Sequence, residues 1–157
     1  GALARVKQLW LDSNRLGPAG ASALLAGLGC GAAPRLTLLN LCTNELGDAG
    51  AASLAAALSR GALPKLEVLF FSGNDVGDEA LAALAPGLRQ RPAFKRLCLH
   101  SNRLGDAGAA CLVGNLGAKE FKQLERLDLQ FNQITDAGCA TLTAAIQGGS
   151  LPALCLE

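Results

Sequence analysis

His100 and Cys98 are the residues that come closest to a nucleophilic site. His100 is the single histidine of the chain, Ser101 follows it directly, and Cys98 and Arg96 precede it. A nucleophile needs a base and an orienting acid that converge on it, and a reactive thiol needs a lowered pKa. The sequence pattern supplies neither, so we interpret these residues as part of an exposed surface and expect no enzymatic activity.

A series of aspartates is the next candidate for chemistry, because recurrent carboxylates can bind cations. Asp48, Asp78, Asp106 and Asp136 recur at similar intervals, and Pro18 stands at the equivalent place nearest the N-terminus. Each precedes an apolar pattern that is typical of a helix. Asp accepts hydrogen bonds from free N–H groups at a helix N-terminus, and Pro also suits this end. We therefore predict that each aspartate caps its own helix.

Metal, cofactor and redox chemistry are not favoured. The six cysteines, at positions 30, 42, 98, 111, 139 and 155, are scattered without a CxxC pair and accompany one histidine. This pattern predicts reduced thiols, a cytoplasmic location and no metal site. Neither GxxxxGK[ST] nor GxGxxG is present, so we expect no nucleotide and no small-molecule cofactor.

Composition narrows the choice of partner. Only 17% of the 157 residues are charged and the net charge is +1, which argues against nucleic acid or an anionic membrane as the partner. No apolar run approaches the roughly 18 residues that span a bilayer, and no signal peptide is visible. Half of the residues are apolar, which is ample for a buried core.

The elements that would position these residues are internal repeats. Residues 36–58, LTLLNLCTNELGDAGAASLAAAL, recur with variations at intervals of 30, 30, 28, 30 and 30 residues, counted from the starts Val6, Leu36, Leu66, Phe94, Leu124 and Leu154. A period in this range predicts a solenoid. We expect one array over residues 1–157, with five full repeats and the start of a sixth. Neither end shows a cap, which suggests an excerpt of a longer protein.

One asparagine per repeat provides a common reference: Asn14, Asn44, Asn74, Asn102 and Asn132. Leu or Phe occupies the positions five and three residues before it, which is the period of a strand with one buried face. Pairs such as Leu54 and Leu58 follow at helical spacing. Each repeat is thus predicted as strand, turn, helix and return loop, which gives a parallel sheet backed by helices. The asparagines are expected to satisfy buried backbone groups.

Three details of the helical half add expectations. A small residue six positions after each asparagine, as at Gly50 and Gly138, is expected to let the helix approach the sheet. Pro86 should kink or shorten its helix, with a tighter return through residues 89–92. The outer helix face is expected to be rich in alanine, which raises the alternative of a second packing surface there. The alanines are Ala21, Ala26, Ala51, Ala52, Ala55, Ala56, Ala82, Ala85, Ala109, Ala110 and Ala140.

The frame LxxLxLxxNxL, followed by a helix, resembles the leucine-rich repeat of the ribonuclease-inhibitor subfamily. Residues 46–58 and 134–146, LGDAGAASLAAAL and ITDAGCATLTAAI, are similar to the repeats of nucleotide-binding leucine-rich-repeat receptors. The resemblance covers nearly the whole chain. It implies an α/β horseshoe, with the parallel sheet on the concave face and the helices on the convex face.

Side chains between the core leucines of each strand should face the concave surface. They form three columns whose residues vary while their neighbours repeat, and apolar residues dominate the N-terminal half whereas charges dominate the C-terminal half. The residues predicted to contact a partner are Trp10, Leu38, Asn40, Val68, Phe70, Arg96, Cys98, His100, Arg126, Asp128 and Gln130. Exposed aromatic and arginine side chains are common at protein interfaces.

The sequence therefore favours a non-enzymatic scaffold that binds a protein on its concave face. Resemblance to the receptors implies a sensing or regulatory array in innate immunity. The alternative is a GTPase-activating protein for a small Ras-like nuclear-transport GTPase, because such proteins share this repeat type. A purely architectural role, for instance in cytoskeletal or ciliary assemblies, remains a third hypothesis.

Overall fold

A computed structural model describes residues 1–116 and 124–151 of the chain, and the sixth repeat predicted from Leu154 lies outside these ranges. Within them, strands and helices alternate along the chain. The elements are β1 (Gln8–Trp10), α1 (Gly17–Gly29), β2 (Leu38–Asn40), α2 (Gly47–Ser59), β3 (Val68–Phe70), α3 (Asp78–Arg89), β4 (Arg96–Cys98), α4 (Asp106–Leu116), β5 (Arg126–Asp128) and α5 (Asp136–Gln147).

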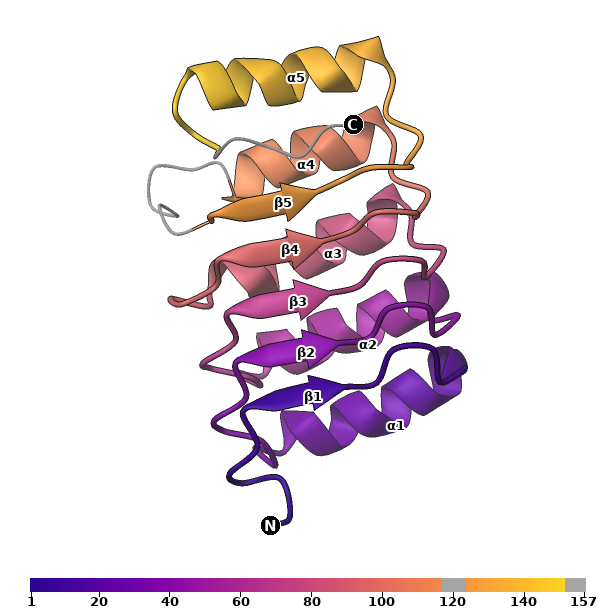
Figure 1. Ribbon diagram of the computed structural model, residues 1–157, viewed down its shortest axis with the longest axis vertical. Helices are drawn as coiled ribbons and strands as arrows, with labels where there is room; N and C mark the ends of the chain where they lie inside the picture. Colours follow the sequence, from indigo (N-terminus) through magenta and orange to yellow (C-terminus); the bar gives the residue numbers. More distant parts are fainter. Residues whose placement is uncertain (117–123, 152–157) are drawn as a thin grey trace.

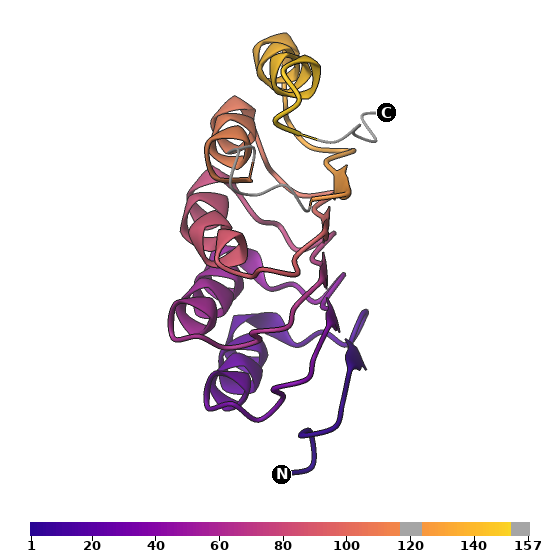
Figure 2. The ribbon, with the colours of Figure 1, turned by 90° about the vertical axis from the view of Figure 1, so that its left-hand side faces the viewer.

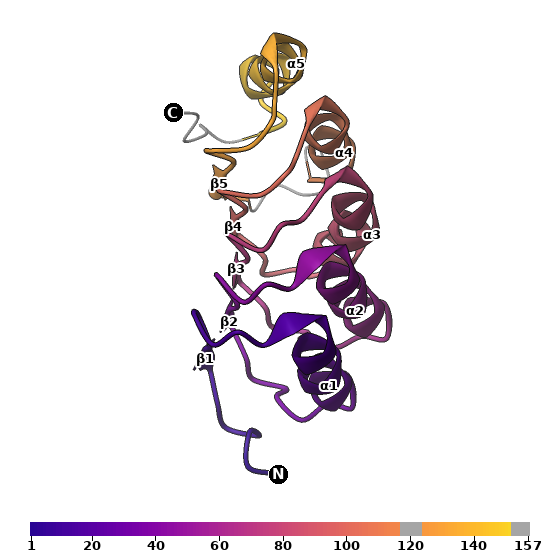
Figure 3. The same ribbon diagram turned by 90° about the vertical axis from the view of Figure 1, so that its right-hand side faces the viewer.

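The strands form one parallel sheet in chain order, β1-β2-β3-β4-β5, and the helices form a second layer (Figure 1). Seen from either side, all helices lie on the same face of the sheet (Figures 2 and 3). The stack bends gently so that the strands line its inner side. The predicted solenoid, with a concave sheet and convex helices, is thus confirmed.

The register places equivalent residues of successive repeats side by side. Leu39 pairs with Leu9 and Leu69, and the same column continues through Leu97 and Leu127. The column is buried in β2 to β5, as is the column that includes Leu41 and Phe71. Core residues of the first repeat, such as Val6, Leu9 and Leu11, are partly buried. The predicted core columns are therefore correct.

The asparagine column serves the backbone, as predicted. The Asn44 amide donates from Nδ2 to the carbonyls of Leu11 and Leu41, at 2.8 and 3.1 Å, and its Oδ1 accepts from the N–H of Asn14 and Leu16. Asn44 thus ties its own turn to that of the preceding repeat. Asn74, Asn102 and Asn132 make equivalent bonds.

The prediction that each aspartate caps its own helix is wrong. No side-chain cap bond is present at the start of α2, α3 or α5. Instead Oδ1 of Asp48 accepts from the N–H of Gly77, the N-cap residue of α3, at 2.8 Å. Asp78 accepts in the same way from Gly105 at 2.8 Å. These aspartates lie inside the first helical turn rather than at the N-cap, so their carboxylates reach the next repeat.

The small residues after each asparagine have a different cause from the one predicted. A Cβ on Gly50 would lie 2.6 Å from Cβ of Leu46, in the turn before its own helix. A Cβ on Gly138 would lie 2.3 Å from Oδ1 of Asp106, in the preceding repeat. The position is therefore kept small by the first turn and by the aspartate of the neighbouring repeat, and not by the sheet.

The alanine-rich outer face is narrower than predicted. Six of the named alanines are exposed, but five are buried in the core: Ala21, Ala51, Ala55, Ala85 and Ala109. A helix in a solenoid contacts the helices on either side as well as the sheet behind it. Its buried sector is consequently wider than the leucine stripe alone.

Pro86 does not end its helix. α3 continues to Arg89, and 12 residues make it similar in length to the others. The shorter unit instead loses its two residues in the return loop, which spans 90–95 where the loop after α2 spans 60–67. The tighter return is thus confirmed. Arg91, only 5% exposed, takes the place of Leu63 in the preceding loop and donates to the carbonyl of Leu58.

Candidate protein-binding surface

The predicted contact residues lie on the concave side of the sheet, in register with one another. One column contains Gln8, Leu38, Val68, Arg96 and Arg126, and the next contains Trp10, Asn40, Phe70, Cys98 and Asp128. A third, just beyond the strands, includes His100 and Gln130. The stacking of repeats thus brings together residues that are 28 or 30 positions apart in the sequence.

An aromatic pair occupies the N-terminal half of this surface. The ring centroids of Trp10 and Phe70 are 6.0 Å apart, with the planes tilted by 46°. The two residues lie on β1 and β3, so their rings meet above β2. Trp10 is 54% exposed, and its Nε1–H donates to Oε1 of Gln8 at 3.2 Å. An exposed, preformed aromatic contact is a feature of interaction surfaces.

Asn40 lies between the two aromatic residues in the register and is 7% exposed. Its Nδ2 donates to Oδ1 of Asp12 at 3.2 Å, and its Oδ1 accepts from the N–H of Cys42 at 3.0 Å. Both ends of the amide are therefore held by the protein. We assign Asn40 to the floor beneath the rings, and Leu38 and Val68, both partly exposed, to the apolar margin.

Charged residues occupy the C-terminal half. Arg96 and Arg126 are exposed and lie side by side, as register partners on β4 and β5. Asp128 follows on β5, and its Oδ1 accepts from the N–H of Gln130 at 3.1 Å. His100 is half-buried and its Nδ1 lies 3.2 Å from Oγ of Ser101. This half of the surface can therefore select partners by charge.

The thiols on this face are poor nucleophiles. Burial, together with the nearby Asp128 carboxylate, raises the pKa of Cys98 from 9.0 to about 11. Burial also raises the pKa of Cys42. Both thiols are therefore protonated at neutral pH. Because a thiol reacts as the thiolate, neither is an effective nucleophile. None of the five cysteines between residues 1 and 151 that the structure describes forms a disulfide.

Phe131 is an exposed aromatic residue that the sequence analysis did not single out. It is 77% exposed and its φ of 54° lies in the left-handed region. The equivalent positions hold Ser13, Thr43, Gly73 and Ser101, also at positive φ. A bulky residue is rare in this conformation, so the backbone at Phe131 is strained. The only sequence feature that distinguishes Phe131 is its size, because the equivalent positions of the other repeats hold small residues.

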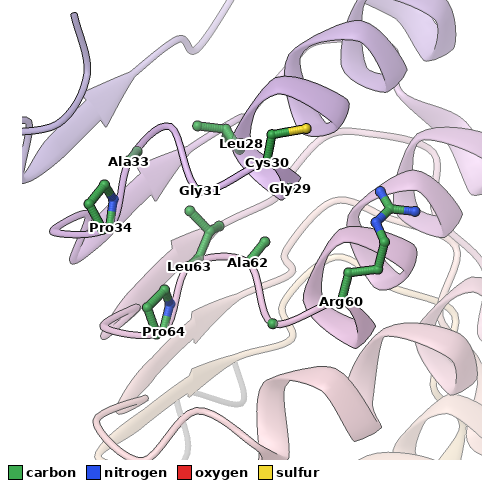
Figure 4. Close-up of a pocket in the computed structure, with 11 residues that line it drawn as sticks. Leu28, Gly29, Cys30, Gly31, Ala33, Pro34, Arg60, Ala62, Leu63 and Pro64 are labelled. Atoms are coloured by element: carbon green, nitrogen blue, oxygen red, sulfur yellow. The ribbon is translucent and has the colours of Figure 1, made fainter. Parts of the chain in front are cut away.

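The structure also has a shallow pocket away from the sheet, of about 270 Å³ (Figure 4). It lies between the loops that follow α1 and α2, where Pro34 and Pro64 occupy corresponding places. Its lining is mostly apolar, with Cys30 and Arg60 near the helix ends. Because Arg60 is its one charged group, the pocket lacks the converging polar groups of a small-molecule site.

Comparison with known proteins agrees with this architecture. The leucine-rich repeat family model matches residues 34–55, 62–85 and 123–142. The fold is a leucine-rich-repeat solenoid. No curated protein matches the sequence. The chain is similar in structure to the C-terminal domain of tropomodulin from Caenorhabditis elegans, with a TM-score of 0.73 and 15% identity, over 92% of this chain and 84% of that one.

A second similar structure is described as actin-binding site 2 of leiomodin-1. It matches with a TM-score of 0.64 and 17% identity, over 85% of this chain and 76% of that chain. At such identities both likenesses concern the fold alone.

Among the described residues, no helix is long and apolar enough to cross a membrane. The same residues contain no group of three or more His, Cys, Asp or Glu side chains placed to hold a metal ion.

Proposed function

We propose that this chain is a non-enzymatic protein-binding scaffold whose concave sheet holds a segment of a protein partner. The observation that carries the proposal is the exposed contact between Trp10 and Phe70. An aromatic pair of this kind buries a large apolar area on binding, and a few such residues supply most of the free energy of an interface. The charged residues beside it would then set the orientation of the partner.

Capture of partners from cell lysate tests the proposal. The wild-type chain is compared with Trp10→Ala/Phe70→Ala, and circular dichroism with thermal melting establishes that the variant is folded. Phe131→Ala serves as the matched control, because it removes an exposed aromatic ring outside the pair. A partner retained by the control and lost by the double variant supports the concave surface. A partner retained by both variants contradicts it.

Actin is the first individual partner to test, because the leiomodin-1 structure is described as an actin-binding site. Cosedimentation with actin filaments, and gel filtration with monomeric actin, would detect an interaction. Abolition by Trp10→Ala/Phe70→Ala would place actin on the concave face. The receptor role and the GTPase-activating role remain predictions from the sequence, as does the ribonuclease-inhibitor-like subfamily.

A further inference from the structure

Two adjacent columns of charged residues, one just before the strands and one at their first position, differ in whether their charges are paired. In the first, Nζ of Lys95 lies 2.7 Å from Oε2 of Glu67. Glu67 raises the pKa of Lys95 through a hydrogen bond and its charge, and Glu125 adds to this. The charges of this column are therefore compensated within the fold.

The next column contains Arg96 and Arg126, which are register partners on β4 and β5. Both are exposed, and neither makes an ion pair in the part of the chain that the structure describes. Like charges directly opposite each other on neighbouring strands are destabilising. Asp128 follows on β5, but one of its oxygens already accepts from the backbone of Gln130. Within the described residues both guanidinium groups are thus left without an acidic partner, and an external anion would supply one.

The order of the strands sets the approximate distance between the arginines and the aromatic pair. The Trp10 and Phe70 rings meet above β2, while Arg96 is on β4 and Arg126 on β5. Strands are spaced by about 4.8 Å, which places the arginines roughly 10 and 15 Å from the ring pair across the sheet. An extended peptide covers about 3.3 Å per residue, so these distances correspond to about three and five residues.

We infer that the partner is an acidic protein segment with an apolar or aromatic anchor, whose carboxylates lie about three to five residues from that anchor. This inference rests on the proposed function and specifies the chemistry of its ligand. The anchor packs on Trp10 and Phe70, and the carboxylates pair with Arg96 and Arg126. A guanidinium binds a carboxylate with two parallel hydrogen bonds, so the arginines also fix the direction of the segment.

A protein is favoured over nucleic acid as the source of the negative charge. The whole chain carries a net charge of +1, and the column next to the arginines is compensated internally. A nucleic-acid backbone, by contrast, is usually met by an extended basic surface. The aromatic rings also contact each other, which favours one apolar anchor over a row of stacked bases.

Selection from a library of displayed random peptides tests the inference with the whole 157-residue chain. The same selection is run on Arg96→Glu/Arg126→Glu and on the control Arg35→Glu/Lys65→Glu. Both control positions are exposed, and the change in net charge is identical. A synthetic peptide from the wild-type selection is then titrated against these three proteins and against Trp10→Ala/Phe70→Ala, with and without a single-stranded oligonucleotide as competitor.

We expect wild type and control to enrich Asp or Glu at this spacing from an aromatic or aliphatic residue. The Arg96→Glu/Arg126→Glu variant should enrich Lys or Arg there, and bind the acidic peptide about tenfold more weakly or worse. Peptides that depend on Trp10 and Phe70 but show no acidic preference would overturn this inference and leave the proposed function standing. No enrichment at all would contradict both. If the oligonucleotide displaces the peptide and binds more tightly than the peptide does, the arginines would be reassigned to a nucleic-acid site.

Discussion

Thr135, at the N-cap of α5, is capped by Asp106, which lies at the start of the preceding helix, 29 residues earlier in the chain. Oδ1 of Asp106 accepts from the N–H of Thr135 at 2.8 Å and from the N–H of Gly138 at 3.1 Å. The Thr135 hydroxyl donates to Oδ2 of the same carboxylate, and this bond, with the two backbone donors, holds the pKa of the Asp106 carboxyl below its ordinary value of 3.8. The second, third and fourth repeats therefore each provide part of the helix cap of the repeat that follows.

This relationship predicts a pH dependence for Asp106→Ala. A carboxyl whose pKa is lowered by folding stabilises the native state fully above its unfolded pKa, and this contribution is lost as the pH falls through the folded pKa. We expect Asp106→Ala to lower the melting temperature at pH 7. The difference from wild type should shrink below pH 3.8. Melting curves over this range provide the measurement, and a constant difference would contradict a role for the ionised form.

Leu69→Ala tests the core column. Leu69 is fully buried on β3, so the substitution should lower the free energy of unfolding by about 2–5 kcal/mol. Leu38→Ala is the matched control, because Leu38 lies on the neighbouring strand but faces the concave surface. Urea unfolding measures both variants. Equal and small effects would mean that the assigned register is incorrect.

Trp10→Ala should leave the fold nearly intact. The indole is more than half exposed, and its contact with Phe70 is expected to contribute at most about 1.5 kcal/mol. Thermal unfolding provides the comparison, with Leu69→Ala as the reference for loss of a core side chain. A destabilisation as large as that of Leu69→Ala would show that Trp10 belongs to the core.

Phe131→Gly should increase stability. A left-handed backbone costs an L-residue roughly 1–2 kcal/mol, and glycine avoids this at some expense in chain entropy, so we expect a gain of up to about 1 kcal/mol. Phe131→Ala removes the same ring but keeps the strain. Comparing the two variants therefore separates the effect of backbone strain on stability from the effect of losing the ring. Lower stability of the glycine variant than of the alanine variant would show that Phe131 is not strained.

Cys98 should resist alkylation. With a pKa of about 11 rather than 9.0, its thiolate fraction at pH 7 is about a hundredfold lower than that of an ordinary thiol. Mass spectrometry after timed labelling should show Cys98 modified far more slowly than the exposed Cys30 and Cys139. Labelling of Cys98 at the same rate would contradict the raised pKa.

Much of the fold could be predicted because it is encoded once per repeat. Leu97 and Leu99 are buried and alternate with residues that are at least partly exposed, in β4 and just after it. The same pattern recurs at a fixed period, so strands, core columns and parallel order follow from the spacing. The asparagine column could be interpreted for the same reason. The concave columns, including Trp10, Phe70, Arg96 and Arg126, also follow from alternation along a strand.

The tertiary structure decided which repeat each side chain acts on. Asp48 has the residue type and the approximate position of a cap for its own helix, yet it binds Gly77 because the helices stack side by side and its carboxylate points to the next one. Likewise, the 6.0 Å contact between Trp10 and Phe70 depends on the stacking distance and on side-chain direction. A periodic sequence specifies what each unit contains, whereas only the packing of units determines which equivalent residues meet.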